Sequence, residues 1–214
     1  MDLTQQTGLN PAPNLQQGMV ARNHSGHEVN DVHELLSGTI GVLDQYMMFR
    51  QYVQCQELLG ILDRQYQFMM DEYNMLVQCF HTGQDPQHGT KRYQMHQSNE
   101  NIVYGIKPGQ PKKPAQSLAE ISSQHISGYM LGHVKSMAGM KAVAATEITN
   151  PVVRRVVADS VPNCIEMAYE LFLYQNKNGY YPLPQYNEQD MKMMQNAYAP
   201  AQGMPQMPQP QMMQ

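Results

Sequence analysis

The sequence is short of charged residues, tryptophan and cysteine. Charged side chains make up 15% of the 214 residues, there is no tryptophan, and the formal net charge is −4. A typical globular domain has about 25% charged residues. The weak acidic balance argues against a nucleic-acid binder that works by neutralising phosphates.

Three cysteines, Cys55, Cys79 and Cys164, are too few and too scattered for a disulfide framework or a zinc site with CxxC spacing. We predict that they are small buried hydrophobic residues, with interchain crosslinking as the alternative.

Long apolar runs are also missing. No segment approaches the 18 or more apolar residues of a membrane span. The first residues, 1–6, lack the basic and apolar regions of a secretory signal, so we expect synthesis in the cytosol.

The chain is rich in uncharged amides and in methionine, of which there are 19. This bias is concentrated at the two ends. Residues 1–26 are rich in Gln, Asn, Gly and Pro, and residues 187–214 are rich in Met, Gln and Pro. Segments of this composition cannot bury a core, and the repeated prolines exclude helix. We predict disordered tails at both ends.

Between the tails, apolar residues recur at helical spacing in two blocks. The first predicts a helical hairpin over 28–81, with Asn30 or Asp31 as its N-cap and Glu34 near the position of a capping box. One helix of this length would span about 75 Å. We therefore expect a turn near Tyr52–Gln56, although no Pro or Gly marks it.

The second block predicts a hairpin over 118–178. Its first helix covers about Ile121–Thr146, and its second begins at Pro151 with Asn150 as N-cap. The second helix is expected to end at 177–179, where Gly179 can adopt the left-handed cap. Pro162 lies inside this helix and is expected to kink or divide it.

The polar segment 82–117 separates the two hairpins and has no helical pattern. Two hairpins joined by a long crossover is the connection of a ferritin-like four-helix bundle, whereas an up-and-down bundle needs only short loops. We therefore predict an all-α, ferritin-like bundle over 27–186.

Active ferritin-like bundles bind two metal ions through Glu-x-x-His pairs. No histidine here has a glutamate three residues before it; Asp85 and His88 come nearest, but lie in the crossover. The histidines His27 and His33 are six apart, whereas a zinc-protease helix needs four. We read these residues and their Glu neighbours as exposed polar residues at a helix start, with His24 and His27 at most a weak metal site. The sequence predicts no catalytic, cofactor-binding or metal residues, and no cofactor.

Small residues recur at four-residue spacing in the third predicted helix, at Gly128, Gly132 and Ser136. Such a face permits close helix packing. Packing within the bundle is one interpretation, and self-association through this face is the other.

Two segments resemble the spore coat protein F (CotF-type) family of endospore-forming bacteria. His27–Leu36 (HEVNDVHELL) is similar to the family's opening helix. Tyr169–Phe172 (YELF) and Asn178–Pro182 (NGYYP) are similar to its closing helix and exit. The resemblance covers about 27–186, with the crossover unmatched and Gln54-Cys55 in place of an Asp-Pro type of turn. It implies a ferritin-like fold and a structural, non-enzymatic protein of the spore coat, made in the mother cell, and it brings no catalytic residues.

The composition suits such a role, because low charge weakens repulsion between molecules and flexible methionines adapt to varied surfaces. We expect other coat proteins as partners, a possible homo-oligomer, no nucleic acid and no membrane span. Tyrosines near the C-terminal end are predicted crosslinking points: Tyr180, Tyr181, Tyr186 and Tyr198. The alternatives are a ferritin-like metal-binding or redox protein and a generic helical adaptor.

Overall fold

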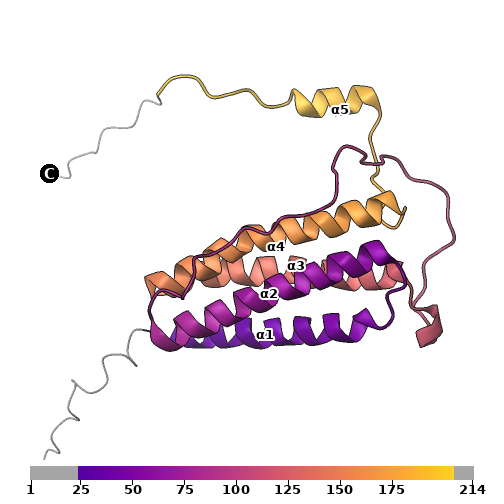
Figure 1. Ribbon diagram of the computed structural model, residues 1–214. Coiled ribbons are helices and arrows are strands. Elements are labelled where there is room, and N and C mark those ends of the chain that lie inside the picture. Colours follow the sequence, from indigo (N-terminus) through magenta and orange to yellow (C-terminus); the bar gives the residue numbers. More distant parts are fainter. Residues whose placement is uncertain (1–23, 205–214) are drawn as a thin grey trace, which may run out of the picture.

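Four long helices form the body of the protein in a computed structural model that describes residues 24–204 (Figure 1). They are α1 (Gly26–Arg50), α2 (Gln56–Thr82), α3 (Ser123–Glu147) and α4 (Pro151–Lys177). This part of the chain also contains the short helices η2 (Leu118–Glu120) and α5 (Glu188–Gln195) and an isolated antiparallel bridge between Gly105 and Leu183. The predicted all-α bundle is confirmed. None of the described helices is long and apolar enough to cross a membrane.

The first hairpin turns at residues 51–55, where the limit on helix length predicted a break. The start of α1 differs from the prediction, because the N-cap is Ser25 and not Asn30 or Asp31. The Ser25 hydroxyl accepts a hydrogen bond from the Glu28 backbone N–H at 3.1 Å. All three residue types are good N-caps, so local sequence did not decide between these starts.

The second hairpin follows its local signals closely. The Asn150 side chain accepts hydrogen bonds from the backbone N–H groups of Val152 and Val153 at 2.9 and 3.2 Å, so it caps α4 ahead of Pro151 as predicted. At the other end, Gly179 has a φ of 73° and the Tyr180 N–H bonds to the Gln175 carbonyl at 2.8 Å. This is the left-handed cap predicted for Gly179.

Pro162 does not divide α4, which is a single helix of 27 residues. Proline removes one N–H from the hydrogen-bond ladder and crowds the carbonyl four residues earlier. Both Pro162 and Ala158 are exposed. The carbonyl that loses its partner therefore belongs to a residue on the exposed side of the helix, where water can bond to it.

The predicted tails are described only in part. Residues 1–23 and 205–214 lie outside the described residues. Within the C-terminal tail, residues 188–195 form α5, so the prediction of disorder is wrong there. Asn187 caps this helix by accepting a hydrogen bond from the Asp190 N–H, and no α5 residue is buried.

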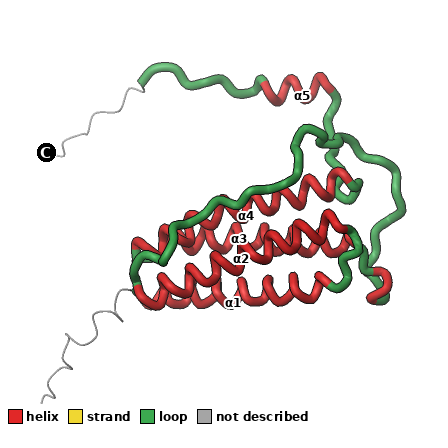
Figure 2. The backbone as a smooth tube through the Cα atoms, in the orientation of Figure 1, coloured by secondary structure: helices red, strands yellow, loops and turns green. Residues whose placement is uncertain are grey.

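The direction of the helices explains the long crossover. Helices α2 and α3 run the same way, so the end of α2 and the start of α3 lie at opposite ends of the bundle (Figure 1). A helix of 27 residues is about 40 Å long. The chain between them must cover this length, and it does so as an extended segment along α4 (Figure 2). The predicted hairpin–crossover–hairpin connection is confirmed, and it is the connection of ferritin-like bundles.

Two asparagines of α4 bind the crossover backbone. The Asn163 amide accepts from the Tyr93 N–H at 2.9 Å and donates to the Lys91 carbonyl at 2.9 Å. Asn176 accepts from the Val103 N–H at 2.8 Å and donates to the Val103 carbonyl at 2.9 Å. These amides replace the partners that an extended strand would find in a sheet.

The core consists of two clusters of buried apolar side chains, one around Tyr46, Leu58 and Tyr174 and the other around Val32, Leu76 and Val153. Part of the methionine excess lies in this core, as the helical spacing predicted. Five methionines are at most 5% exposed: Met69, Met75, Met130, Met137 and Met167.

A buried carboxylate joins the start of α1 to the turn between α3 and α4. The Glu28 side chain is 0% exposed, and its Oε2 accepts hydrogen bonds from the backbone N–H groups of Thr149 and Asn150, both at 3.0 Å. Burial opposes its charge, but the Thr149, His24 and Asn150 hydrogen bonds outweigh burial and lower the pKa of Glu28. The expectation of an exposed polar residue is wrong at Glu28, although His27, His33 and Glu34 are exposed.

Candidate functional site

The centre of the bundle contains a second buried carboxylate, that of Glu170 on α4, which is 0% exposed. Its Oε1 accepts hydrogen bonds from Arg64 Nη2 and, at 2.9 Å, from the His96 backbone N–H. Its Oε2 accepts from the Tyr93 hydroxyl and, at 3.2 Å, from Gln65 Nε2. Both oxygens are therefore fully engaged with protein donors.

The donors around Glu170 are themselves fixed. Gln65 also donates to the Met167 carbonyl at 3.1 Å and accepts from the Tyr46 hydroxyl at 3.0 Å. Burial, followed by the hydrogen bond to Glu170, raises the pKa of Tyr93, so this phenol stays protonated and donating. The network thus links α1, α2, α4 and the crossover.

A third interior carboxylate is paired with a buried lysine. Lys141 of α3 donates to Glu72 Oε2 at 3.0 Å, and Asn163 donates to Glu72 Oε1 at 2.7 Å. Burial works to lower the pKa of Lys141, but the charges of Glu72 and Cys164 and the hydrogen bonds to both side chains together outweigh burial and raise that pKa. In the described part of the bundle, the interior carboxylates thus serve as hydrogen-bond acceptors that tie helices together.

The Asp85/His88 pair does not converge on a common point. Asp85 forms an ion pair with Arg155 of α4, whereas His88 Nε2 lies 3.3 Å from Asp71 Oδ1 of α2. His24 and His27 also point to different partners. His24 bonds to Glu28 at 2.7 Å and packs on the Phe80 ring, and it does not belong to the group of possible ligands around His27.

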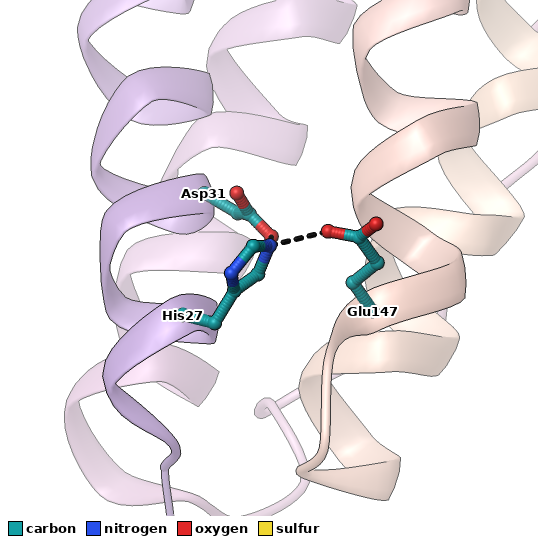
Figure 3. Close-up of side chains that lie close together, drawn as sticks. All are labelled: His27, Asp31 and Glu147. Carbon is teal, nitrogen blue, oxygen red and sulfur yellow. Dashed lines mark hydrogen bonds and ion pairs between the residues drawn. The ribbon is translucent and has the colours of Figure 1, made fainter.

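His27 instead meets two carboxylates at the surface (Figure 3). Its Nε2 bonds to Glu147 Oε2 at the end of α3 and lies 3.4 Å from Asp31 Oδ2, one turn along α1. The Glu-x-x-His and zinc-protease spacings relate residues of a single helix, so they could not indicate this cluster. His27 and Glu147 are 120 residues apart, so no local signal was available.

The three cysteines are free thiols in the structure. Cys79 and Cys164 are buried, as predicted, and burial raises the pKa of Cys79 to about 11 and also raises that of Cys164. Cys55 differs, because it is half-buried at the N-cap of α2. Burial works to raise its pKa, but hydrogen bonds from Tyr174 and from the backbone of Leu58 and Glu57 lower the pKa of Cys55.

An apolar surface lies along the junction of α1 and α3. We call it the α1–α3 face and define it by Gly38, Gly41, Ser136, Met140 and Val143. These residues line two hollows of ≈ 320 and ≈ 300 Å³. Met140 and Val143 are 43% and 64% exposed, so the face presents apolar side chains to solvent.

The predicted stripe of small residues is divided between two surroundings. A Cβ at Gly128 would lie 3.8 Å from Gln175 of α4, whereas a Cβ at Gly132 would meet nothing within 4 Å. Ser136 belongs to the α1–α3 face. Close packing within the bundle therefore does not explain Gly132, and self-association through this side of α3 stays a prediction.

The helices form a bundle of the hairpin–crossover–hairpin class, and the polar groups in its interior stabilise the fold. A family model, the Coat F domain, matches residues 122–184, which span α3, α4 and the Gly179–Pro182 exit. The spore coat protein F-like protein YhcQ of Bacillus subtilis (strain 168) is 52% identical over 178 residues, covering 83% of this chain and 82% of that protein.

The crystal structure of a candidate spore coat protein from Bacillus halodurans C-125 has the same fold. The TM-score is 0.55 at 16% identity, over 77% of this chain and 96% of that one. Given the extent of the similarity to YhcQ, the chain belongs to the spore coat protein F family. This places it among the proteins of the bacterial spore coat and confirms the resemblance seen in its opening and closing helices.

The Glu170 network predicts that Glu170→Gln is strongly destabilising. The amide removes one acceptor oxygen and the charge that pairs with Arg64, and urea unfolding should show a loss of about 3 kcal/mol. The matched control is Glu166→Gln. Glu166 lies one turn away, is half-buried and has no hydrogen-bond partner among the described residues. The free energy of unfolding of this variant should lie within about 0.5 kcal/mol of wild type. Equal stabilities for the two variants would contradict the role assigned to Glu170.

The cysteine environments predict an order of reactivity. Because the thiolate is the nucleophile, folded protein treated with iodoacetamide at neutral pH should be alkylated at Cys55 before Cys79 and Cys164. Mass spectrometry of peptides from a time course measures this order. Labelling of all three at equal rates without denaturant would refute it, and labelling in denaturant provides the control.

Proposed function

We propose that the protein is a structural component of the spore coat that assembles with copies of itself and with other coat proteins through the α1–α3 face. Membership of the spore coat protein F family supports a structural role in the coat. The observation that carries the assembly proposal is the exposure of Met140 and Val143 beside two hollows floored by small residues.

The physical character of this face suits association. A contiguous exposed apolar surface marks interaction sites on folded proteins. Methionine is flexible and adapts to partners of different shape. The chain has only 15% charged residues, so repulsion between copies is weak. Many weak contacts in one layered assembly add to a strong overall association.

A structural role also agrees with the use of the interior polar groups. Glu28, Glu72 and Glu170 accept hydrogen bonds from backbone or side chains of neighbouring elements. Groups saturated in this way stabilise the fold and offer no free carboxylate for acid–base work. The bundle then acts as a stable block whose outer surface makes the contacts.

The tyrosines predicted as crosslinking points differ in exposure. The Tyr181 ring packs against Phe172 with centroids 5.3 Å apart, and Tyr180 packs against Tyr174 at 6.4 Å. Tyr186 and Tyr198 are 66% and 90% exposed. Accessibility therefore favours Tyr186 and Tyr198 as the points that another coat protein can reach.

The α1–α3 face is tested by placing charge on it. In Met140→Glu/Val143→Glu, assembly would bury two carboxylates, which is unfavourable. A fluorescent fusion of this variant, produced from the native promoter in sporulating cells, should show about tenfold less signal on the spore than wild type, a change of 1.4 kcal/mol. Circular dichroism of the purified variant checks that the bundle still folds.

The matched control is Ile165→Glu on α4, where the native side chain is 58% exposed and lies outside the α1–α3 face. This variant should localise like wild type. A folded double variant that also localises like wild type would show that the face is not the assembly surface. Expression in vegetative cells, without any in sporulating mother cells, would refute the coat role and favour a general helical adaptor.

Crosslinking is tested by peptide mapping of purified spore coats. Dityrosine is expected at Tyr186 and Tyr198, and not at the buried Tyr46 and Tyr174, because a crosslink requires two rings to meet outside the core. Replacing Tyr186 and Tyr198 with Phe should leave folding intact and remove these linked peptides. Coats without dityrosine at either position would contradict this prediction.

A further inference from the structure

Three polar side chains meet at the surface where the start of α1 lies beside the end of α3. We propose that His27, Asp31 and Glu147 form a binding site for one divalent first-row transition-metal ion, with Zn²⁺ as the probe. The metal site does not depend on the coat role, although Asp31 also lines the hollow beside Met140 and Val143. Three observations support this site: its geometry, a shielded oxygen of Asp31 that accepts no hydrogen bond among the described residues, and the chemistry of the three side chains.

The geometry suits a small ion with short bonds. One ligand atom from each residue lies within 4.8 Å of the other two. Zinc binds nitrogen and oxygen at about 2.0–2.2 Å in tetrahedral sites, which places ligand atoms roughly 3.4 Å apart. The observed separation of His27 Nε2 and Asp31 Oδ2 is 3.4 Å.

Helical spacing sets two of the ligands. His27 and Asp31 are four residues apart on α1, so their side chains lie on the same face of the helix. Glu147 approaches from the last turn of α3 and points at the same imidazole (Figure 3). Its side chain is 47% exposed, so solvent and ions can reach the contact between it and His27.

The second observation is the state of Asp31. Its Oδ2 is shielded from solvent and has no hydrogen-bond partner among the described residues. Buried carboxylate oxygens without a partner are costly and rare. The Asp31 Oδ2 atom forms an ion pair with His27 Nε2 at 3.4 Å, on the side where the three ligand atoms meet. A bound cation would satisfy this oxygen.

The donor set indicates the class of ion. An imidazole with two carboxylates suits Zn²⁺ and neighbouring transition metals, whereas Mg²⁺ and Ca²⁺ prefer oxygen ligands alone. Three protein ligands at an exposed site leave the remaining coordination to water. Bound there, the ion would link the first turns of α1 to the end of α3.

The proton competes with the metal at His27. The charged groups that face its ring are Asp31 on its own helix and Glu147 on α3. The Glu147 hydrogen bond, followed by the charge of Asp31, raises the pKa of His27. A metal ion would replace the proton on His27 Nε2, because it requires the neutral imidazole.

Isothermal titration of the full chain with ZnCl₂ tests the site. Wild-type protein should bind one ion per chain in the presence of excess Mg²⁺. Each of His27→Ala, Asp31→Asn and Glu147→Gln removes one ligand, and the affinity should fall by roughly tenfold or more. His33→Ala, which removes another exposed histidine of α1, is the matched control and should bind like wild type.

Visible absorption with Co²⁺ gives a second readout that does not depend on stability. A low-symmetry Co²⁺ spectrum in wild type should be lost in Asp31→Asn while circular dichroism stays unchanged. The proposal is overturned if wild type binds no Zn²⁺, if His27→Ala binds it as tightly as wild type, or if His33→Ala weakens it equally. None of these results would bear on coat assembly.

Discussion

The arrangement of this protein depends on the hydrogen bonds that the buried Glu170 carboxylate accepts from the crossover and from α2. Helices α2 and α3 run in the same direction, so the chain between them must pass along the whole bundle (Figure 1). An extended segment carries unpaired backbone groups, and these need partners when they lie against a protein surface. Helix α4 provides them at intervals of about two turns, from Asn163, Glu170 and Asn176.

The need to bind the crossover also determines which carboxylates in the interior are free to bind other groups. A ferritin-like bundle turns chemically active when inward carboxylates are left to coordinate metal. Here the carboxylates of Glu170 and Glu72 hold the crossover, Arg64, Lys141 and Asn163 in place. These polar groups of the interior therefore stabilise the fold. The α1–α3 face and the His27 cluster lie on the surface of the bundle.

The parts of the fold that could be predicted from the sequence are those set by near neighbours in the chain. Asn150 and Pro151 mark the start of α4, and Gly179 marks its end, because capping involves residues within one turn. The first hairpin was predicted only from a limit on helix length. Ser25 was missed because Asn30 and Asp31 are equally good caps. Pro162 was expected to interrupt α4, but its exposed position removes most of the cost.

The roles of the buried acids could not be predicted in this way. Glu28 binds backbone groups 121 and 122 residues away, and Glu170 binds the His96 amide 74 residues away. In the sequence these glutamates look like any polar residue on a helix, and only the packing of the helices gives them partners. The same holds for Glu147, which meets His27 through the α1–α3 contact.

Hydrogen–deuterium exchange of the native protein tests the central claim, that α4 side chains hold the crossover. The backbone amides of Tyr93, His96 and Val103 donate to α4 side chains although they lie outside any helix or strand. The account predicts strong protection of these three amides and rapid exchange at exposed crossover residues such as Ile106 and Gln110. Exchange of Tyr93, His96 and Val103 as fast as that of Ile106 and Gln110 would contradict it.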